Sequence, residues 1–244
     1  MKKILIILGT SRSGSTFLDS MLGNSPNGLS VGEMHALFRP WRPHHRLLSR
    51  SCFCNIKECN FWSQIKKKGE KKVYYNIFQK IKDLKFIVDS SKSLHWFWDQ
   101  LRYNEKNNYN LKFIPIIIFK TPIEYAYSLY KRDNLNIKLW KLSWIKTHLR
   151  LFYILDHFIT VRYKDLALNP SHKLREICEK VRIDYFDGKE NFWQVTSTHF
   201  LFGSDTLRNS RRHISYQNQY NKKKLDFIKE NLIMDDQLTS ILSV

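Results

Sequence analysis

The chain has 244 residues, of which 43% are hydrophobic and 14% aromatic, so it can bury a full core and is not a disordered protein. Its uncharged apolar runs are far shorter than the ~20 residues of a membrane-spanning helix, and the run after the initial Met-Lys-Lys is too brief for a signal peptide. We expect one domain, residues 1–244, without a transmembrane segment and in the cytoplasm.

Lys and Arg outnumber Asp and Glu by 41 to 22, a formal net charge of +19 that attracts anions. The lysines are spread along the whole chain, and no nucleic-acid-binding motif accompanies them. We therefore expect no specific nucleic-acid partner, although nonspecific binding at low salt follows from the charge.

The first candidate site follows the apolar run Ile4–Leu8, which is typical of a buried parallel strand. Gly9 and Gly14 allow the backbone to approach an anion at the start of a helix near Ser15. The spacing is that of a Walker A loop with Ser15 in place of Lys, so ATP hydrolysis is disfavoured. An ordinary strand-to-helix turn is the alternative. The candidate phosphate-binding residues are Thr10, Ser11, Arg12, Ser13, Gly14, Ser15 and Thr16.

The run Ser-Arg-Ser-Gly-Ser-Thr-Phe-Leu resembles the 5′-phosphosulfate loop of sulfotransferases that use 3′-phosphoadenosine 5′-phosphosulfate (PAPS). The resemblance implies a single α/β domain of the P-loop NTPase-like sulfotransferase fold, with a parallel β-sheet flanked by helices. It also implies PAPS as the cofactor, adenosine 3′,5′-bisphosphate as the product, and no metal ion.

A short extended segment, residues 29–33, ends at Glu33, and His35 follows. Sulfuryl transfer to a hydroxyl needs a base that removes the acceptor proton. The run around Glu33 resembles the Gly-Glu segment of the same family, which implies that Glu33 is this base. His35 is the alternative base, and a surface Glu at a helix start is the alternative interpretation.

Three cysteines cluster as Cys-x-Cys-x₄-Cys at Cys52, Cys54 and Cys59. With a nearby His they could hold a metal ion, but structural zinc sites usually show two well-separated ligand pairs. The spacing favours a structural or redox-labile loop. The run resembles a cysteine segment on the acceptor side of bacterial-type sulfotransferases. We expect residues 36–70 and 93–110, which contain many Trp, Tyr and His residues, to shape the acceptor site.

A Lys-rich amphipathic stretch, residues 66–85, predicts one helix before the strand Phe86–Val88. Asp-Ser-Ser-Lys-Ser follows this strand, where ligands of open α/β sheets bind. It resembles a family motif, and the resemblance implies that Lys92 neutralises charge on the transferring group. A common strand-to-helix turn is the alternative.

The next strand, Phe113–Phe119, contains Pro115, which predicts an edge or a bend in its first part. Lys120 follows, and Pro122 opens a helix that carries Ser128. The segment resembles the family's 3′-phosphate motif with Lys in place of Arg, so it implies phosphate contacts from Lys120 and Ser128. Lys binds phosphate as a point charge rather than as a bidentate fork.

The remaining pattern predicts one or two helices over 134–158, a strand over 158–163, a helix opened by Asn169-Pro170 and a helix over 222–242. A segment near residue 203 resembles the family's Gly…Arg element, which implies that Arg208 closes over the 3′-phosphate. Arg211 and Arg212 are alternatives, as is a basic tail without a function.

Two other functions remain open from the sequence. A nucleotide or nucleoside kinase of the same broad fold would need the missing loop Lys and Mg²⁺. A polyanion-binding protein without enzyme activity would bind through net charge alone. For a sulfotransferase, the acceptor is a hydroxyl or amine of a carbohydrate, a lipid-linked glycan or a small molecule.

Overall fold

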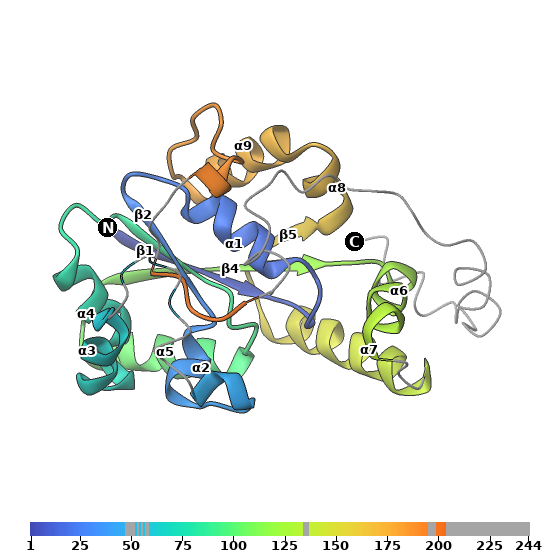
Figure 1. The fold of residues 1–244 in the computed structure, drawn as a ribbon, viewed down its shortest axis with the longest axis horizontal. Coiled ribbons are helices and arrows are strands. Elements are labelled where there is room, and N and C mark those ends of the chain that lie inside the picture. The colour runs from blue at the N-terminus through green and yellow to red at the C-terminus, as the bar shows by residue number, and fades with distance from the viewer. Residues whose placement is uncertain are drawn as a thin grey trace.

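Five parallel strands form one open sheet in the order β2-β3-β1-β4-β5 (Figure 1). The structure, a computed structural model, describes residues 1–46, 52, 54, 56, 59–133, 137–194 and 199–203. The strands are β1 Lys2–Leu8, β2 Gly28–Gly32, β3 Phe86–Asp89, β4 Leu111–Phe119 and β5 Ile159–Arg162. The parallel α/β fold expected from the sequence is confirmed.

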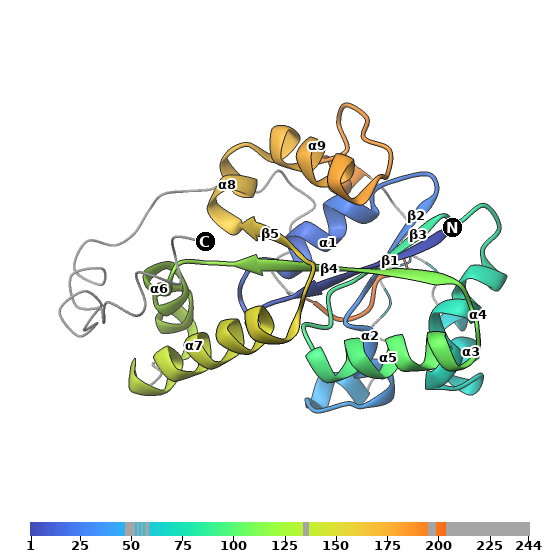
Figure 2. The same cartoon turned by 180° about the vertical axis from the view of Figure 1, so that it is seen from behind.

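Helices cover both faces of the sheet (Figures 1 and 2). One face carries α1 Ser15–Gly23, α8 Tyr163–Leu168 and α9 Pro170–Val181. The opposite side carries α2 Met34–Phe38, α3 Phe61–Lys67, α4 Val73–Lys80, α5 Leu94–Lys106 and α7 Ile137–Ile154, and α6 Pro122–Asp133 follows the end of β4. Short 3₁₀ turns occupy Pro43–Arg46, Glu70–Lys72 and Phe192–Gln194. Among the described residues, no helix combines the length and apolarity needed to span a bilayer.

Strand β1 is the centre of the core because both of its faces are buried. Ile4, Ile6 and Leu8 pack with α3, α4, α5 and α7, whereas Leu5 and Ile7 pack with α1 and α9. Side chains alternate along a strand, so an uninterrupted apolar run is what a strand covered on both faces requires. Because β1 is also the middle strand of the sheet, its carboxyl end lies at the centre of the edge where the parallel strands end.

Pro115 lies inside β4 without breaking the sheet. Residues from Leu111 onwards pair with β1, but pairing with β5 begins only at Ile116. Because Pro has no N–H to donate, it fits a stretch that has a neighbour on one side only. The predicted edge character of the first part of this strand is thus confirmed.

The single helix predicted over 66–85 is wrong. The chain forms α3, a 3₁₀ turn and α4 there, and the break falls at Gly69, whose φ is +88°. Helix α4 ends at Lys80, since Ile81 is extended. The helical periodicity was real, but Gly69 adopts a left-handed conformation that L-residues disfavour. The helix expected over 222–242 lies outside the described residues.

Candidate active site

The loop between β1 and α1 lies at the carboxyl edge of the sheet. Gly14 has a φ of +100°, and a Cβ on it would lie 2.2 Å from Cδ2 of Tyr163. Only glycine fits this position. As the N-cap residue of α1, Gly14 has no side chain to satisfy the first helical N–H groups. The helix start, with no acidic residue in its first turn, is suited to an anion.

Two hydroxyls in this loop are buried without a partner. Thr10 Oγ1 and Ser13 Oγ have no hydrogen-bond partner among the described residues, and their residues are 4% and 0% exposed. Leaving a buried hydroxyl unsatisfied costs about 1–3 kcal/mol. A ligand with acceptor oxygens would remove that cost, so the loop suits a phosphate or sulfate group.

Lys120 brings a cation to the same loop from the end of β4. Its Nζ lies 4.4 Å from the ring centroid of Tyr163 and 3.5 Å from Oγ of Ser128 on α6. Burial, followed by the positive charge of Arg12, lowers the pKa of Lys120 to about 8, against a smaller opposing effect of Glu124. Two cations that repel each other beside unsatisfied hydroxyls indicate a site for an anion.

Glu33 and Lys92 meet at the ends of β2 and β3. Lys92 Nζ donates to Glu33 Oε1 at 2.8 Å and to the carbonyl of Ser90 at 2.8 Å. Burial pushes the pKa of Glu33 up, but the charge and hydrogen bond of Lys92 outweigh it, and the pKa lies below its ordinary value. Glu33 is therefore ionised at neutral pH.

Arg12 and Lys92 both have left-handed backbone, with φ of 69° and 58°. Non-glycine residues in this region are uncommon, but Asp83, Asn108 and Arg182 share it away from this site, so the conformation alone assigns no role.

His35 lies in α2 rather than on an extended segment. Its backbone N–H donates to Ser91 Oγ at 2.9 Å. The centroid of its ring lies 5.0 Å from that of Trp41 and 5.7 Å from that of Trp96. Burial, then the charge of Arg39, lowers the pKa of His35, so the ring is neutral at pH 7. Glu33 precedes the helix and faces Lys92.

A second histidine, not selected from the sequence, lies closer to the carboxylate. His45 Nε2 is 3.8 Å from Glu33 Oε2, and the His45 side chain is fully buried. His45 belongs to the basic segment between α2 and the cysteines, and nothing in its local sequence pattern indicates this contact. Tyr163, whose ring lies against Gly14 and near Lys120 Nζ, was likewise given no role from the sequence.

Buried acids hold the turn that carries Lys92. Asp89 accepts hydrogen bonds from the Ser91 N–H at 2.7 Å and from Trp96 Nε1 at 3.0 Å. Asp19 on α1 accepts from Ser90 Oγ at 2.6 Å, and burial raises the pKa of Asp19 to about 8. These contacts tie the ends of β3 and α1 together.

The predicted residues thus form two groups on one edge of the sheet. The loop residues 10–16 lie with Lys120 and Ser128, and Glu33 lies with Lys92. Arg208, Arg211 and Arg212 lie outside the described residues. The roles of all these residues stay predictions.

No family model matches the sequence, and no curated protein matches it. The open parallel sheet flanked by helices, with a glycine-containing loop between β1 and α1, is a P-loop-like α/β fold. This fold is that of solved sulfotransferases. The sulfotransferase domain of the Synechococcus PCC 7002 olefin synthase is 19% identical, with a TM-score of 0.58, over 96% of this chain and 95% of that one. The sulfotransferase domain of the curacin biosynthetic pathway is 17% identical, with a TM-score of 0.57, over 96% of this chain and 99% of that one.

Proposed function

We propose that this chain is a sulfotransferase that moves the sulfuryl group of PAPS to a hydroxyl or amine of an acceptor. The observation that carries the proposal is the anion site around the loop of residues 10–16. There the buried hydroxyls of Thr10 and Ser13 lack partners, and Lys120 lies within the electrostatic reach of Arg12. The sulfotransferase fold supports it.

In this proposal the phosphosulfate of PAPS lies on the loop amides and hydroxyls. The 3′-phosphate binds Lys120 and Ser128, which are already close to each other. Arg208 is the proposed cover of the same phosphate. The site discriminates nucleotides by that group, because a nucleotide without a 3′-phosphate leaves Lys120 unpaired and partly desolvated.

Glu33 is the proposed base. The acceptor oxygen attacks sulfur, the bond from sulfur to the bridging oxygen of the 5′-phosphate breaks, and the acceptor proton passes to Glu33. Adenosine 3′,5′-bisphosphate leaves. Lys92 offsets charge that develops on the leaving oxygen, and in the free protein it holds the Glu33 carboxylate ionised. We expect no metal ion in this chemistry, since cations already face the developing charge.

The acceptor would enter over Glu33, from residues 36–70 and 93–110. Trp41 is 48% exposed, and its ring lies 4.3 Å from that of His45, which faces Glu33. An exposed indole beside a base offers an apolar surface for a sugar ring or an aromatic acceptor. The acceptor is accordingly a carbohydrate, a lipid-linked glycan or a small molecule.

Thermal unfolding with two nucleotides tests the proposal. Adenosine 3′,5′-bisphosphate at about 100 times its Kd should stabilise the native state by about 2.7 kcal/mol. For a chain of this size that raises the Tm by about 5–10 °C. AMP, which lacks the 3′-phosphate, should raise it much less. An equal shift with AMP would contradict the 3′-phosphate site.

An activity assay separates the rivals. Labelled PAPS with an acceptor panel should give transfer in buffer without Mg²⁺. Phosphate transfer from ATP that depends on added Mg²⁺ would instead favour the kinase. Binding of heparin or RNA with no preference among adenosine nucleotides would favour the polyanion-binding protein.

A further inference from the structure

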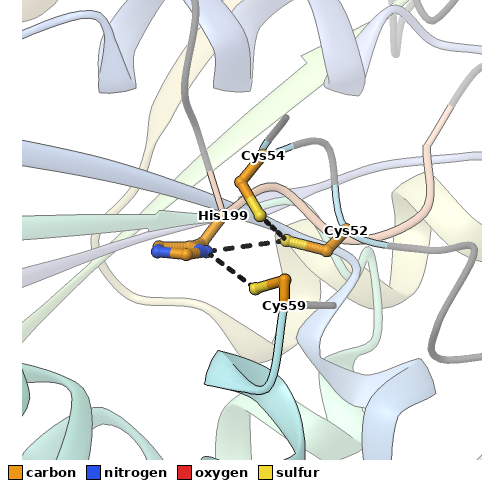
Figure 3. Close-up of side chains that lie close together, drawn as sticks. All are labelled: Cys52, Cys54, Cys59 and His199. Atoms are coloured by element: carbon orange, nitrogen blue, oxygen red, sulfur yellow. Dashed lines mark hydrogen bonds between the residues drawn. The ribbon is translucent and has the colours of Figure 1, made fainter. Parts of the chain in front are cut away.

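Three thiols and one imidazole converge in the structure although they come from distant segments (Figure 3). The ligand atoms of Cys52, Cys54, Cys59 and His199 all lie within 4.8 Å of one another. His199 Nδ1 is 3.6 Å from Sγ of Cys52 and 3.6 Å from Sγ of Cys59, and the sulfurs of Cys52 and Cys54 are 3.3 Å apart. His199 lies 140 residues beyond Cys59.

The two nitrogen-to-sulfur separations fit a tetrahedral metal site. Zn²⁺ binds thiolate sulfur at about 2.3 Å and imidazole nitrogen at about 2.0–2.1 Å, so tetrahedral ligands lie about 3.6 Å apart for sulfur and nitrogen and about 3.8 Å apart for two sulfurs. Both nitrogen-to-sulfur distances agree with that geometry, and the sulfurs of Cys52 and Cys54, 3.3 Å apart, would separate by about 0.5 Å to reach it. Three soft sulfurs and one imidazole nitrogen are a donor set that selects zinc over Mg²⁺ or Ca²⁺.

The imidazole is held in place by its surroundings. The His199 ring stacks on Phe61, with centroids 4.0 Å apart and planes 6° from parallel. Phe61 begins α3, two residues after Cys59. One short segment therefore supplies both a thiol and the surface that orients the histidine, so that Nδ1 points toward the sulfurs (Figure 3).

We propose that Cys52, Cys54, Cys59 and His199 bind one Zn²⁺ in a closed, four-coordinate structural site. Binding replaces the three thiol protons, which are released to solvent. Four protein ligands complete the tetrahedron and leave no position for water or substrate, so the ion has no part in the proposed sulfuryl transfer. The sequence favoured a structural or redox-labile loop over zinc, because the three cysteines do not form the two well-separated ligand pairs that are usual in structural zinc sites.

The proposed zinc would fasten the segment that lies against Glu33. Leu201, two residues after His199, donates its N–H to the Val31 carbonyl at 3.1 Å and accepts from the Glu33 N–H at 3.0 Å. Leu201 also forms a bridge with Cys52. Phe202 packs with its ring 4.8 Å from that of His45. One ion would thus connect the cysteine segment to Leu201 and Phe202, which contact the Glu33 backbone and the His45 ring.

Metal analysis of the full chain tests the site. The protein is purified with a reductant and without chelators, and its zinc is measured by elemental mass spectrometry. We expect about one zinc per chain. Cys59→Ala and His199→Phe should lose nearly all of it, and the Phe ring keeps the stack on Phe61. Cys178→Ala is the matched control, because Cys178 lies on α9 with its side chain buried in the core, and its replacement should leave the zinc content unchanged.

A titration of the wild-type chain with Co²⁺ gives an answer that does not depend on variants that fold. After removal of zinc, one equivalent of Co²⁺ should give the visible absorption of a tetrahedral site and a thiolate-to-cobalt charge-transfer band. A reduced, folded chain with neither zinc nor this spectrum would overturn the proposal. So would retention of zinc by folded His199→Phe, or a Cys52–Cys54 disulfide in a metal-free folded chain.

Discussion

Raising the pH should weaken binding of adenosine 3′,5′-bisphosphate because Lys120 loses its proton. Burial and the neighbouring Arg12 lower the pKa of Lys120 to about 8 in the free protein. A bound phosphate stabilises the ammonium and returns its pKa toward the ordinary value of about 10.4. The protonated form binds, so affinity is full below the free-state pKa and is lost as the pH rises through it.

The magnitude follows from these two pKa values. In the protein without nucleotide, a Lys120 with a pKa of about 8 is about three-quarters protonated at about pH 7.5. At about pH 9.5 only about 3% of it is protonated. If the bound lysine stays charged, the Kd rises by about 20-fold over this range. The phosphates do not add to the change, because their second pKa is about 6. Isothermal titration calorimetry at several pH values measures it.

Lys120→Arg is the matched control, since a guanidinium stays charged throughout this range. Its affinity should vary by less than about 2-fold from pH 7.5 to 9.5. Lys120→Ala and Ser128→Ala should each bind about 10- to 100-fold more weakly at neutral pH. A flat Kd for the wild type would refute the reasoning, as would an arginine variant that keeps the loss at high pH.

Three further predictions concern the base, the loop and a buried acid. Glu33→Gln should lower kcat by at least about 100-fold and leave bisphosphate affinity unchanged. If His35→Ala or His45→Ala abolishes turnover while Glu33→Gln stays active, that histidine and not Glu33 is the base. Gly14→Ala should lower the free energy of unfolding, measured with denaturant, by about 1–3 kcal/mol more than Gly69→Ala does. Both glycines have positive φ, but of the two only Gly14 faces a side chain, the ring of Tyr163. Equal losses of stability in the two variants would contradict the steric argument. Burial raises the pKa of Asp19 to about 8, so its ionisation opposes folding increasingly as the pH rises from about 4 toward 8. Asp19→Asn should therefore raise the Tm more at pH 8 than at pH 5, and a pH-independent difference would contradict the buried-acid account.

The sequence by itself determined the elements whose signals are local. The apolar run of β1, the glycines of the loop and Pro122 at the start of α6 lie within a few residues of the structure that they specify. Parallel strands place their carboxyl ends along one edge, so residues directly after successive strands were expected at one site. The loop of residues 10–16, Lys92 and Lys120 follow three such strands.

Only the tertiary structure decided which side chains meet across the chain. His199 reaches Cys59 over 140 residues, His45 faces Glu33, and Tyr163 packs under Gly14. None of these contacts has a local pattern, because each depends on how two separately formed segments pack on the sheet. The pKa of Lys120 likewise depends on the tertiary structure. It is lowered by the burial of the side chain and by Arg12, which lies in the loop after β1, whereas Lys120 follows β4.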